Sequence, residues 1–222
     1  MLTPRLKAIC DKVTASKTTC DIGTDHAYVP IDLIENNRAE RVIATDLNSG
    51  PLRAALINIK DHSIEDRIEL RQGSGLSVIS EGEADFVIIA GMGGEIIEQM
   101  LREKRLEDCT FILQPMTSQY ELRKYLLNNS YRIEDEDIVT EGFKVYNIIV
   151  CRSGEAKPFE NEFHYQLPPY LYSHKSFKAL YDKKLREFCR ITEGIRKSET
   201  KDCEKLEKYE YFLKELKKIH MD

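Results

Sequence analysis

The sequence contains no stretch that could anchor the chain in a membrane or direct it for secretion. No apolar run approaches the ~20 residues that a membrane-spanning helix needs. The first residues, Met-Leu-Thr-Pro-Arg-Leu-Lys, lack the apolar core of a signal peptide. We therefore expect a cytoplasmic protein with no membrane partner. A length of 222 residues leaves room for one domain of ordinary size and a small appendage.

The cysteines show neither metal-binding nor redox spacing. None of the six belongs to a Cys-x-x-Cys pair, and several fall inside apolar strand patterns. This distribution is typical of reduced thiols in a cytosolic protein, so we expect no zinc and no other metal site.

The chain also has no overall positive charge, which a nucleic-acid-binding protein would be expected to carry. Its net charge is −5. The two parts differ, because residues 153–222 hold 15 basic and 13 acidic residues while residues 1–152 hold 18 basic and 25 acidic residues. Any affinity for RNA would therefore depend on local basic stripes rather than on a global field.

The Gly-x-Gly-x-x-Gly pattern of NAD-binding folds is absent, which weakens the case for a NAD or nucleotide-sugar enzyme. Residues 21–30 instead read Asp-Ile-Gly-Thr-Asp-His-Ala-Tyr-Val-Pro, between a short strand pattern at 17–20 and a helix pattern at 27–36. A turn from a strand into a helix presents backbone N–H groups to a ligand.

Three side chains indicate what that ligand carries. Asp21 and Asp25 flank Gly23, whose missing Cβ lets a ligand approach the backbone. Two carboxylates suit a cationic or amine-bearing ligand better than a pyrophosphate. Asp46 ends the next strand pattern, at a distance along the chain where a carboxylate takes ribose hydroxyls. The pattern predicts a ligand with an amine and a ribose.

Strand and helix patterns alternate through the first two thirds of the chain, and then the alternation stops. Residues 131–140 and 143–150 both read as strands, and only Glu141-Gly142 separates them. So short a gap allows a hairpin and forbids a helical crossover. We therefore predict an α/β fold with a parallel sheet, a final antiparallel hairpin, and five strand patterns before it at 17–20, 41–46, 67–71, 84–90 and 109–113.

The ordered motifs of the first 152 residues resemble those of one family, the bacterial tRNA (adenine-N1)-methyltransferases that act on adenosine 22 (the TrmK family). The motifs are Asp-Ile-Gly-Thr-Asp-His-Ala-Tyr-Val-Pro, then Ala-Thr-Asp-Leu-Asn, Gly-Ser-Gly-Leu, Ala-Gly-Met-Gly-Gly and Leu-Gln-Pro. The resemblance implies a class I methyltransferase with a Rossmann-like sheet, S-adenosylmethionine as cofactor, and tRNA as the partner methylated at N1 of adenosine 22 in the D-arm.

The resemblance also implies roles for particular residues. Asp25 is the candidate catalytic carboxylate, which would stabilise the charge that develops on the methylated ring. The implied cofactor residues are Asp21, Gly23, Asp25, His26, Asp46, Leu47, Gly73, Ser74, Gly75, Ala90, Gly91 and Met92. The candidate substrate residues within the resemblance are Tyr28, Gly93, Gln114 and Pro115. The basic residues Lys183, Arg186 and Arg190 of the C-terminal part, which lies outside the resemblance, are further candidates for contact with tRNA. One of the aromatic residues Tyr28, Tyr120, Phe143 and Tyr146 could stack on an extruded adenine.

The chain departs from the family pattern in a few places. Ser74 stands where relatives commonly have an aspartate that contacts adenine, and Met116 follows Gln-Pro where the family usually has asparagine. Asp25 and Ala27 occupy positions that are glycine in many class I methyltransferases. These departures leave open a methyltransferase acting on another substrate, or a catalytically weakened binding protein with the same fold.

The last third reads as a separate part of the molecule. We expect a cofactor-binding catalytic domain over 1–152, a proline-containing linker over 153–174 and a coiled-coil-like helical hairpin over 175–222. A helical wheel places Lys183, Arg186, Arg190 and Lys197 on one side, opposite the apolar seam. That stripe is either a solvated face or a contact for RNA phosphates. We expect a monomer.

Overall fold

The computed structural model describes residues 2–198, 200 and 202–219; residues 1, 199, 201 and 220–222, which fall within the predicted first and third parts, lie outside the described residues. The strands are β1 (Ser16–Ile22), β2 (Ala39–Asp46), β3 (Ile68–Gln72), β4 (Phe86–Met92), β5 (Thr110–Pro115), β6 (Tyr131–Glu141) and β7 (Lys144–Ser153). The helices are α1 (Pro4–Lys12), α2 (Tyr28–Glu35), α3 (Ser49–Asp61), α4 (Gly94–Glu103), α5 (Gln119–Asn128), α6 (Phe177–Lys197) and α7 (Cys203–Leu216). Three short 3-10 turns are η1 (Gly75–Val78), η2 (Glu162–Tyr165) and η3 (Pro169–Leu171).

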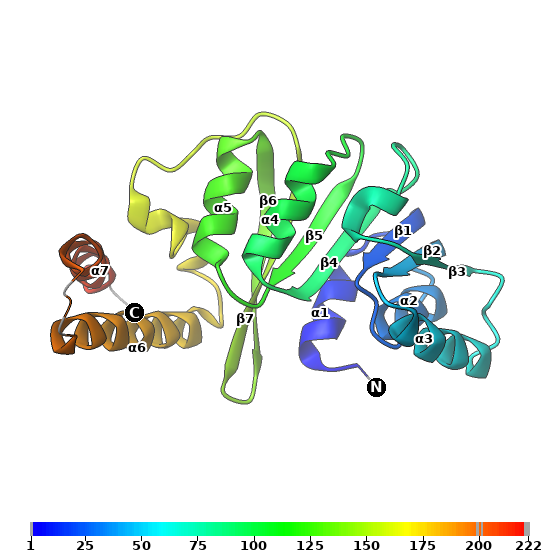
Figure 1. The fold of residues 1–222 in the computed structure, drawn as a ribbon, viewed down its shortest axis with the longest axis horizontal. Helices are drawn as coiled ribbons and strands as arrows, with labels where there is room; N and C mark the ends of the chain where they lie inside the picture. The colour runs from blue at the N-terminus through cyan, green and yellow to red at the C-terminus, as the bar shows by residue number, and fades with distance from the viewer. Residues whose placement is uncertain (1, 199, 201, 220–222) are drawn as a thin grey trace.

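The seven strands form one sheet in the order β3-β2-β1-β4-β5-β7-β6 (Figure 1). Strands β1 to β5 are parallel, and β7 is antiparallel to both β5 and β6. The predicted α/β fold with a terminal hairpin is therefore confirmed. Since the order reverses direction between β1 and β4, the carboxyl ends of these two strands form the place where such sheets bind ligands.

Two apolar layers cover the sheet, one on each face. Residues of α1, α2 and α3 form one layer with the sheet, and residues of α4, α5 and η1 form the other. Val87, Ile88 and Ile89 of β4 are fully buried between them, as the strand pattern at 84–90, apolar except for Asp85, predicts.

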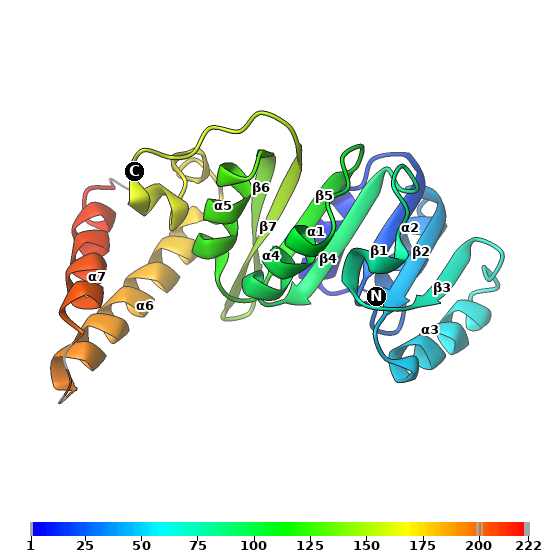
Figure 2. The same ribbon diagram turned by 45° about the horizontal axis from the view of Figure 1, so that its top comes forward.

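The C-terminal helices α6 and α7 lie at the β6–β7 end of the sheet (Figure 2). They pair with each other through aromatic residues, since the Phe188 ring lies 5.6 Å from the rings of both Tyr209 and Phe212. The segment predicted as a linker contains η2 and η3, and its apolar side chains join the same core. These buried side chains are Phe163, Tyr165, Leu167 and Leu171.

A buried ion pair joins the apolar core formed by α6, α7 and the 153–174 segment to the sheet. Arg123 of α5 donates to both carboxylate oxygens of Glu136 on β6, at 3.0 and 2.5 Å. The same carboxylate accepts hydrogen bonds from Tyr170 and Asn147, and Arg123 also donates to the Tyr165 carbonyl. Every charged group of this junction is therefore satisfied, as burial requires.

Two features bear on membrane and metal expectations. None of the helices in the described part of the chain is long and apolar enough to cross a bilayer. Cys20 and Cys109 are buried thiols whose pKa burial raises to about 12. Among the residues that the structure describes, no cluster of three or more His, Cys, Asp or Glu could hold a metal ion.

Candidate active site

A cavity of about 400 Å³ opens at the carboxyl ends of β1, β2 and β4, beneath α1 and α2. Eight of the predicted site residues line it, together with Arg5, Leu6 and Val29, which the sequence did not single out. The eight are Asp21, Gly23, Asp25, Tyr28, Asp46, Ala90, Gly91 and Met92. The motifs that lie far apart in the sequence thus meet at one edge of the sheet.

Gly23 forms the floor of this cavity. Its φ of +76° lies in the left-handed region, and a Cβ added there would sit 2.2 Å from Cε of Met92. The N–H groups of Gly23 and Thr24 both donate to the Thr45 carbonyl, at 2.8 and 2.7 Å, so the turn is fixed to the end of β2. A side chain at position 23 would therefore collide with Met92 and strain the turn.

Asp21 is the buried charged group of the cavity. Its side chain is 6% exposed, and no basic side chain in the described part of the chain pairs with it. Burial raises the pKa of Asp21 to about 6, because a carboxylate in a low-dielectric site is poorly solvated. A cationic group of a ligand would supply the missing partner.

The turn after Gly23 carries backbone strain. His26 and Ala27 have φ of 59° and 56°, in the left-handed region that residues with a Cβ seldom adopt. The Asn58 side chain donates to the His26 carbonyl, and the His26 ring stacks on Tyr28 with 5.4 Å between centroids. Ala27 therefore adopts a left-handed backbone conformation that glycine adopts more easily. This explains why related folds often have glycine at the corresponding position. The turn holds the Asp25 carboxylate exposed at the cavity mouth.

Asp46 is the last residue of β2 and lines the cavity. One oxygen accepts the N–H of Asn48 at 2.7 Å, which orients the carboxyl group and leaves its other oxygen for a ligand hydroxyl. Leu47 is 62% exposed, and Ser74 is exposed with its carbonyl accepting the hydroxyl of Ser77. The predicted residues outside the cavity lining are His26, Leu47, Gly73, Ser74, Gly75, Gly93, Gln114, Pro115, Lys183, Arg186 and Arg190.

The residues of the glycine motif at 91–94 have two separate roles. Ala90, Gly91 and Met92 line the cavity, while Gly93 and Gly94 start α4. A Cβ on Gly94 would lie 2.6 Å from the backbone carbonyl oxygen of Ser118, so this position has to be glycine for α4 to pack on the loop after β5. Part of the motif is therefore helix packing and part is the site.

Arg5 of α1 is the site residue that sequence reasoning missed. Its Nη1 donates to Oε1 of Gln114 at 2.5 Å, and the Gly91 N–H donates to the same oxygen at 3.2 Å. Two donors on one oxygen fix the orientation of the Gln114 amide, whose Nε2 then faces Sδ of Met116 at 3.5 Å. The partners are 109 residues apart in the sequence, so no local pattern links them.

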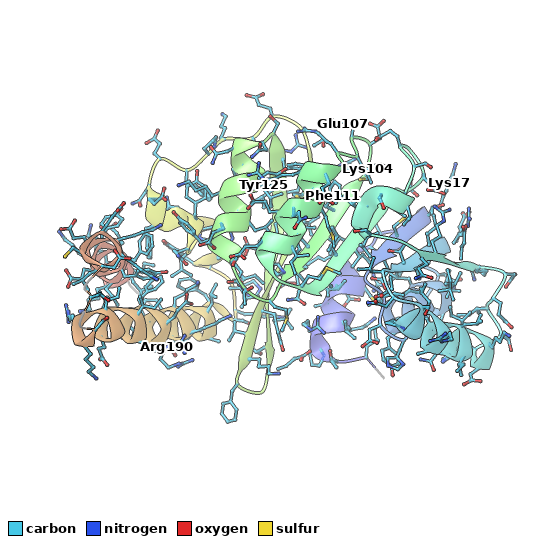
Figure 3. All side chains as sticks on the ribbon, viewed as in Figure 1. Lys17, Lys104, Glu107, Phe111, Tyr125 and Arg190 are labelled. Carbon is cyan, nitrogen blue, oxygen red and sulfur yellow. The ribbon has the colours of Figure 1, made fainter. Side chains whose placement is uncertain are left out.

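The predicted RNA-contacting residues of α6 lie in two environments. Lys183 donates from Nζ to the Val145 carbonyl of β7 at 2.8 Å, and burial lowers the pKa of this amine. Arg186 and Arg190 are exposed, and Arg190 projects from the side of α6 that faces away from α7 (Figure 3). Lys183 therefore attaches the helix to the sheet, while the two arginines face solvent.

The site fits S-adenosylmethionine by its own chemistry. Gly23 exposes its backbone to the cavity, the buried carboxylate of Asp21 has no basic partner among the described residues and suits an amino group, and Asp46 suits a ribose. Gly23, Asp21 and Asp46 are the residues that would hold it.

Comparisons with known proteins agree with this geometry. A family model described as a methyltransferase domain matches residues 2–149. The tRNA (adenine(22)-N(1))-methyltransferase of Bacillus subtilis (strain 168) is 34% identical over 157 residues, which are 69% of this chain and 66% of that protein.

Solved structures extend the likeness to the C-terminal helices. The structure of the B. subtilis M1A22 tRNA methyltransferase TrmK is similar with a TM-score of 0.87 and 28% identity, over 98% of both chains. Streptococcus pneumoniae Sp1610 in complex with S-adenosyl-L-methionine has a TM-score of 0.84 and 27% identity, over 98% of this chain and 99% of that one.

Proposed function

This chain belongs to the methyltransferase-domain family, and from that premise we propose that it transfers a methyl group from S-adenosylmethionine to N1 of adenosine 22 in the D-arm of tRNA. The observation that supports this substrate is the extent of the likeness. The similarity to a tRNA m1A22 methyltransferase structure covers 98% of the chain, so it includes the C-terminal helices as well as the cofactor-binding sheet.

Methyl transfer to N1 of adenine requires alignment of the reacting groups rather than a covalent enzyme intermediate. N1 of adenine has an in-plane lone pair that can attack the methyl group directly, so the protein has to orient the base and exclude water. The bound cofactor supplies an activated methyl group. Gly23, Asp21 and Asp46 hold and orient the cofactor, while Asp25 at the mouth stabilises the positive charge that methylation puts on the ring.

Arg5 lines the cavity and connects it to Gln114 of β5. Arg5 and the Gly91 N–H both donate to Oε1 of Gln114, whose side chain is fully buried and whose Nε2 faces Sδ of Met116. Gln114 thus holds Arg5 and the Gly91 backbone in place at the cavity wall.

The remaining parts of the assignment are proposals too. We propose a division into a cofactor-binding domain over 1–152, a connecting segment over 153–174 and a helical hairpin over 175–222 that contacts tRNA through Arg186 and Arg190. The enzyme acts as a metal-independent monomer in the cytoplasm, where its tRNA substrate is found. Light scattering, and activity in the presence of a chelator, test the monomer and the metal independence.

The test of the function is methyl transfer from labelled S-adenosylmethionine to unmodified tRNA, with the product nucleosides resolved. We expect 1-methyladenosine, and no label when adenosine 22 is replaced by guanosine. Label in another nucleoside, or on the substituted tRNA, would contradict the assignment. Cofactor binding without transfer to any tRNA would favour the catalytically weakened binding protein.

The role of Asp25 is tested separately. Asp25→Asn keeps the shape of an exposed side chain and removes its charge, so we expect cofactor affinity within about threefold of native and a 10²- to 10³-fold loss of kcat, the range for losing one transition-state contact. Calorimetry measures the affinity. A variant that no longer binds cofactor would move Asp25 from catalysis to cofactor binding.

A further inference from the structure

The β6–β7 hairpin projects from the same edge of the sheet as the cofactor cavity (Figure 1). Strand β6 runs in the direction of the parallel strands, because β5 and β6 are both antiparallel to β7. The last β5–β7 pair joins Leu113 to Ile149, whereas the β6–β7 pairs continue to Glu141 and Lys144. The hairpin therefore extends roughly 15 Å beyond the last β5–β7 pair, at about 3.4 Å per residue.

The tip of this arm carries an unburied aromatic ring. Phe143 lies in the two-residue loop between β6 and β7, and its side chain is fully exposed, at 105% relative accessibility. Single exposed apolar residues are common on protein surfaces and need no function by themselves. Phe143 differs from the other exposed apolar residues because it lies at the end of the β6–β7 hairpin, which projects from the edge of the sheet that carries the cavity.

Contacts from both sides hold the arm in position. On one side the Arg5 N–H donates to Oε1 of Glu141 at 2.6 Å, and the Arg5 guanidinium lies 5.5 Å from the centre of the Tyr146 ring. On the other side Lys183 of α6 donates to the Val145 carbonyl. Arg5 and helix α6, which carries Arg186 and Arg190, therefore both contact the hairpin near its tip.

These contacts place the outer part of the hairpin between α1, which lines the cavity, and α6, which carries Arg186 and Arg190. The hairpin therefore lies where an RNA bound to both regions can contact its tip. An adenosine in a stem has to leave its helix before N1 is accessible, which leaves neighbouring bases with an open face. Aromatic side chains stack on such faces whatever the base.

We propose that the β6–β7 hairpin is an RNA-contacting arm, and that Phe143 stacks on a D-arm base next to the target adenosine and holds the target out of its stem. This inference rests on the proposed function. It adds a contact at a site that the cofactor cavity and the basic helix do not include.

The experiment compares native protein, Phe143→Ala and Phe143→Trp on two tRNA transcripts, one with adenosine 22 paired and one whose facing base is changed to leave it unpaired. A lost base–aromatic stack lowers kcat/KM about 5- to 150-fold, so we expect a loss in that range for Phe143→Ala on the paired transcript. On the unpaired transcript we expect less than about a threefold loss. Phe143→Trp should retain activity on both, and calorimetry should give unchanged cofactor affinity.

Ile57→Ala is the matched control, since Ile57 is 62% exposed on α3, at the opposite end of the sheet from α6 (Figure 2). Equal kcat/KM for native, Phe143→Ala and Ile57→Ala would overturn the proposal while leaving the methyltransferase intact. Equal losses on both transcripts would overturn the role in exposing the target. A Phe143-dependent dimer with unchanged tRNA kinetics would assign the ring to self-association instead. A native protein that neither binds nor methylates tRNA would overturn both this inference and the proposed function.

Discussion

Two buried carboxylates, Glu136 and Asp21, lie in different regions of this molecule and differ in their hydrogen-bond and charge partners. Glu136, at the junction with the C-terminal helices, has both oxygens bonded to Arg123 and accepts further hydrogen bonds from Tyr170 and Asn147. Asp21, under the cofactor cavity, has no basic partner within the described residues, and burial raises its pKa to about 6.

The difference separates a structural charge from a functional one. A buried charge whose hydrogen-bonding capacity is filled by its own protein fixes how segments pack. A buried charge without a partner costs stability and persists where a ligand supplies the partner. The sequence places Asp21 beside Gly23 in a candidate ligand-binding turn and Glu136 inside a strand pattern, but it does not show which carboxylate has a basic partner.

The largest expected effect is at the junction. Glu136→Gln leaves the Arg123 guanidinium buried without a countercharge, so we expect the free energy of unfolding to fall by about 3–5 kcal/mol in chemical denaturation. Glu134→Gln on the same strand is the control, because its pair with Arg132 is exposed and contributes about 0–1 kcal/mol. Similar losses in the two variants would remove the structural role given to Glu136.

The next effect is an increase in stability rather than a loss. Asp21→Asn removes a buried charge, and a pKa shift from 3.8 to about 6 corresponds to about 1–3 kcal/mol. Because the folded protein holds the proton more tightly than the unfolded chain, native stability should fall as pH rises from about 4 to about 6. We therefore expect the cofactor-free variant to melt above native at pH 7.5 but not at pH 4. A variant that melts lower at pH 7.5 would mean that the carboxylate has a partner in the folded protein.

The smallest effect concerns the exposed charges. Arg186→Glu with Arg190→Glu should weaken tRNA binding about 10- to 100-fold at low salt and reduce the slope of log affinity against log salt by about 2, with cofactor affinity unchanged. Lys17→Glu is the control, since Lys17 lies at the start of β1, away from α6 (Figure 3). Equal tRNA affinity for native and the double variant would remove α6 from the RNA surface.

Local patterns predicted most of the fold. The two-residue gap at Glu141-Gly142 allowed a hairpin and no helical crossover, and the apolar residues 86–90 within the strand pattern at 84–90 indicated a strand covered on both faces. The meeting of Asp21, Asp46 and Gly91 at one cavity followed from parallel strands ending at the same edge.

What the sequence did not reveal depends on contacts between distant residues. The Arg5–Gln114 contact joins the first helix to β5, and no local pattern encodes it. A helical wheel groups Lys183 with Arg186 and Arg190, but it cannot know that β7 comes near enough for Lys183 to bond the Val145 carbonyl. The family motif at 91–94 likewise gives no sign that Gly94 serves packing while Gly91 serves the site.

We infer that the protein keeps the carboxylate of Asp21, which has no basic partner among the described residues, for the amino group of its cofactor. Calorimetric titration of S-adenosylmethionine into native protein between pH 5 and pH 8 tests it most directly, with Asp21→Asn in parallel. Because the cofactor would bind the ionised carboxylate through its protonated amino group, we predict nearly constant affinity between about pH 6.5 and pH 7.5 and roughly tenfold weaker binding for each pH unit below about 6. Asp21→Asn should bind more weakly and without that pH dependence. Native binding that is flat across the range, or an Asp21→Asn variant that binds as native at pH 8, would contradict the claim.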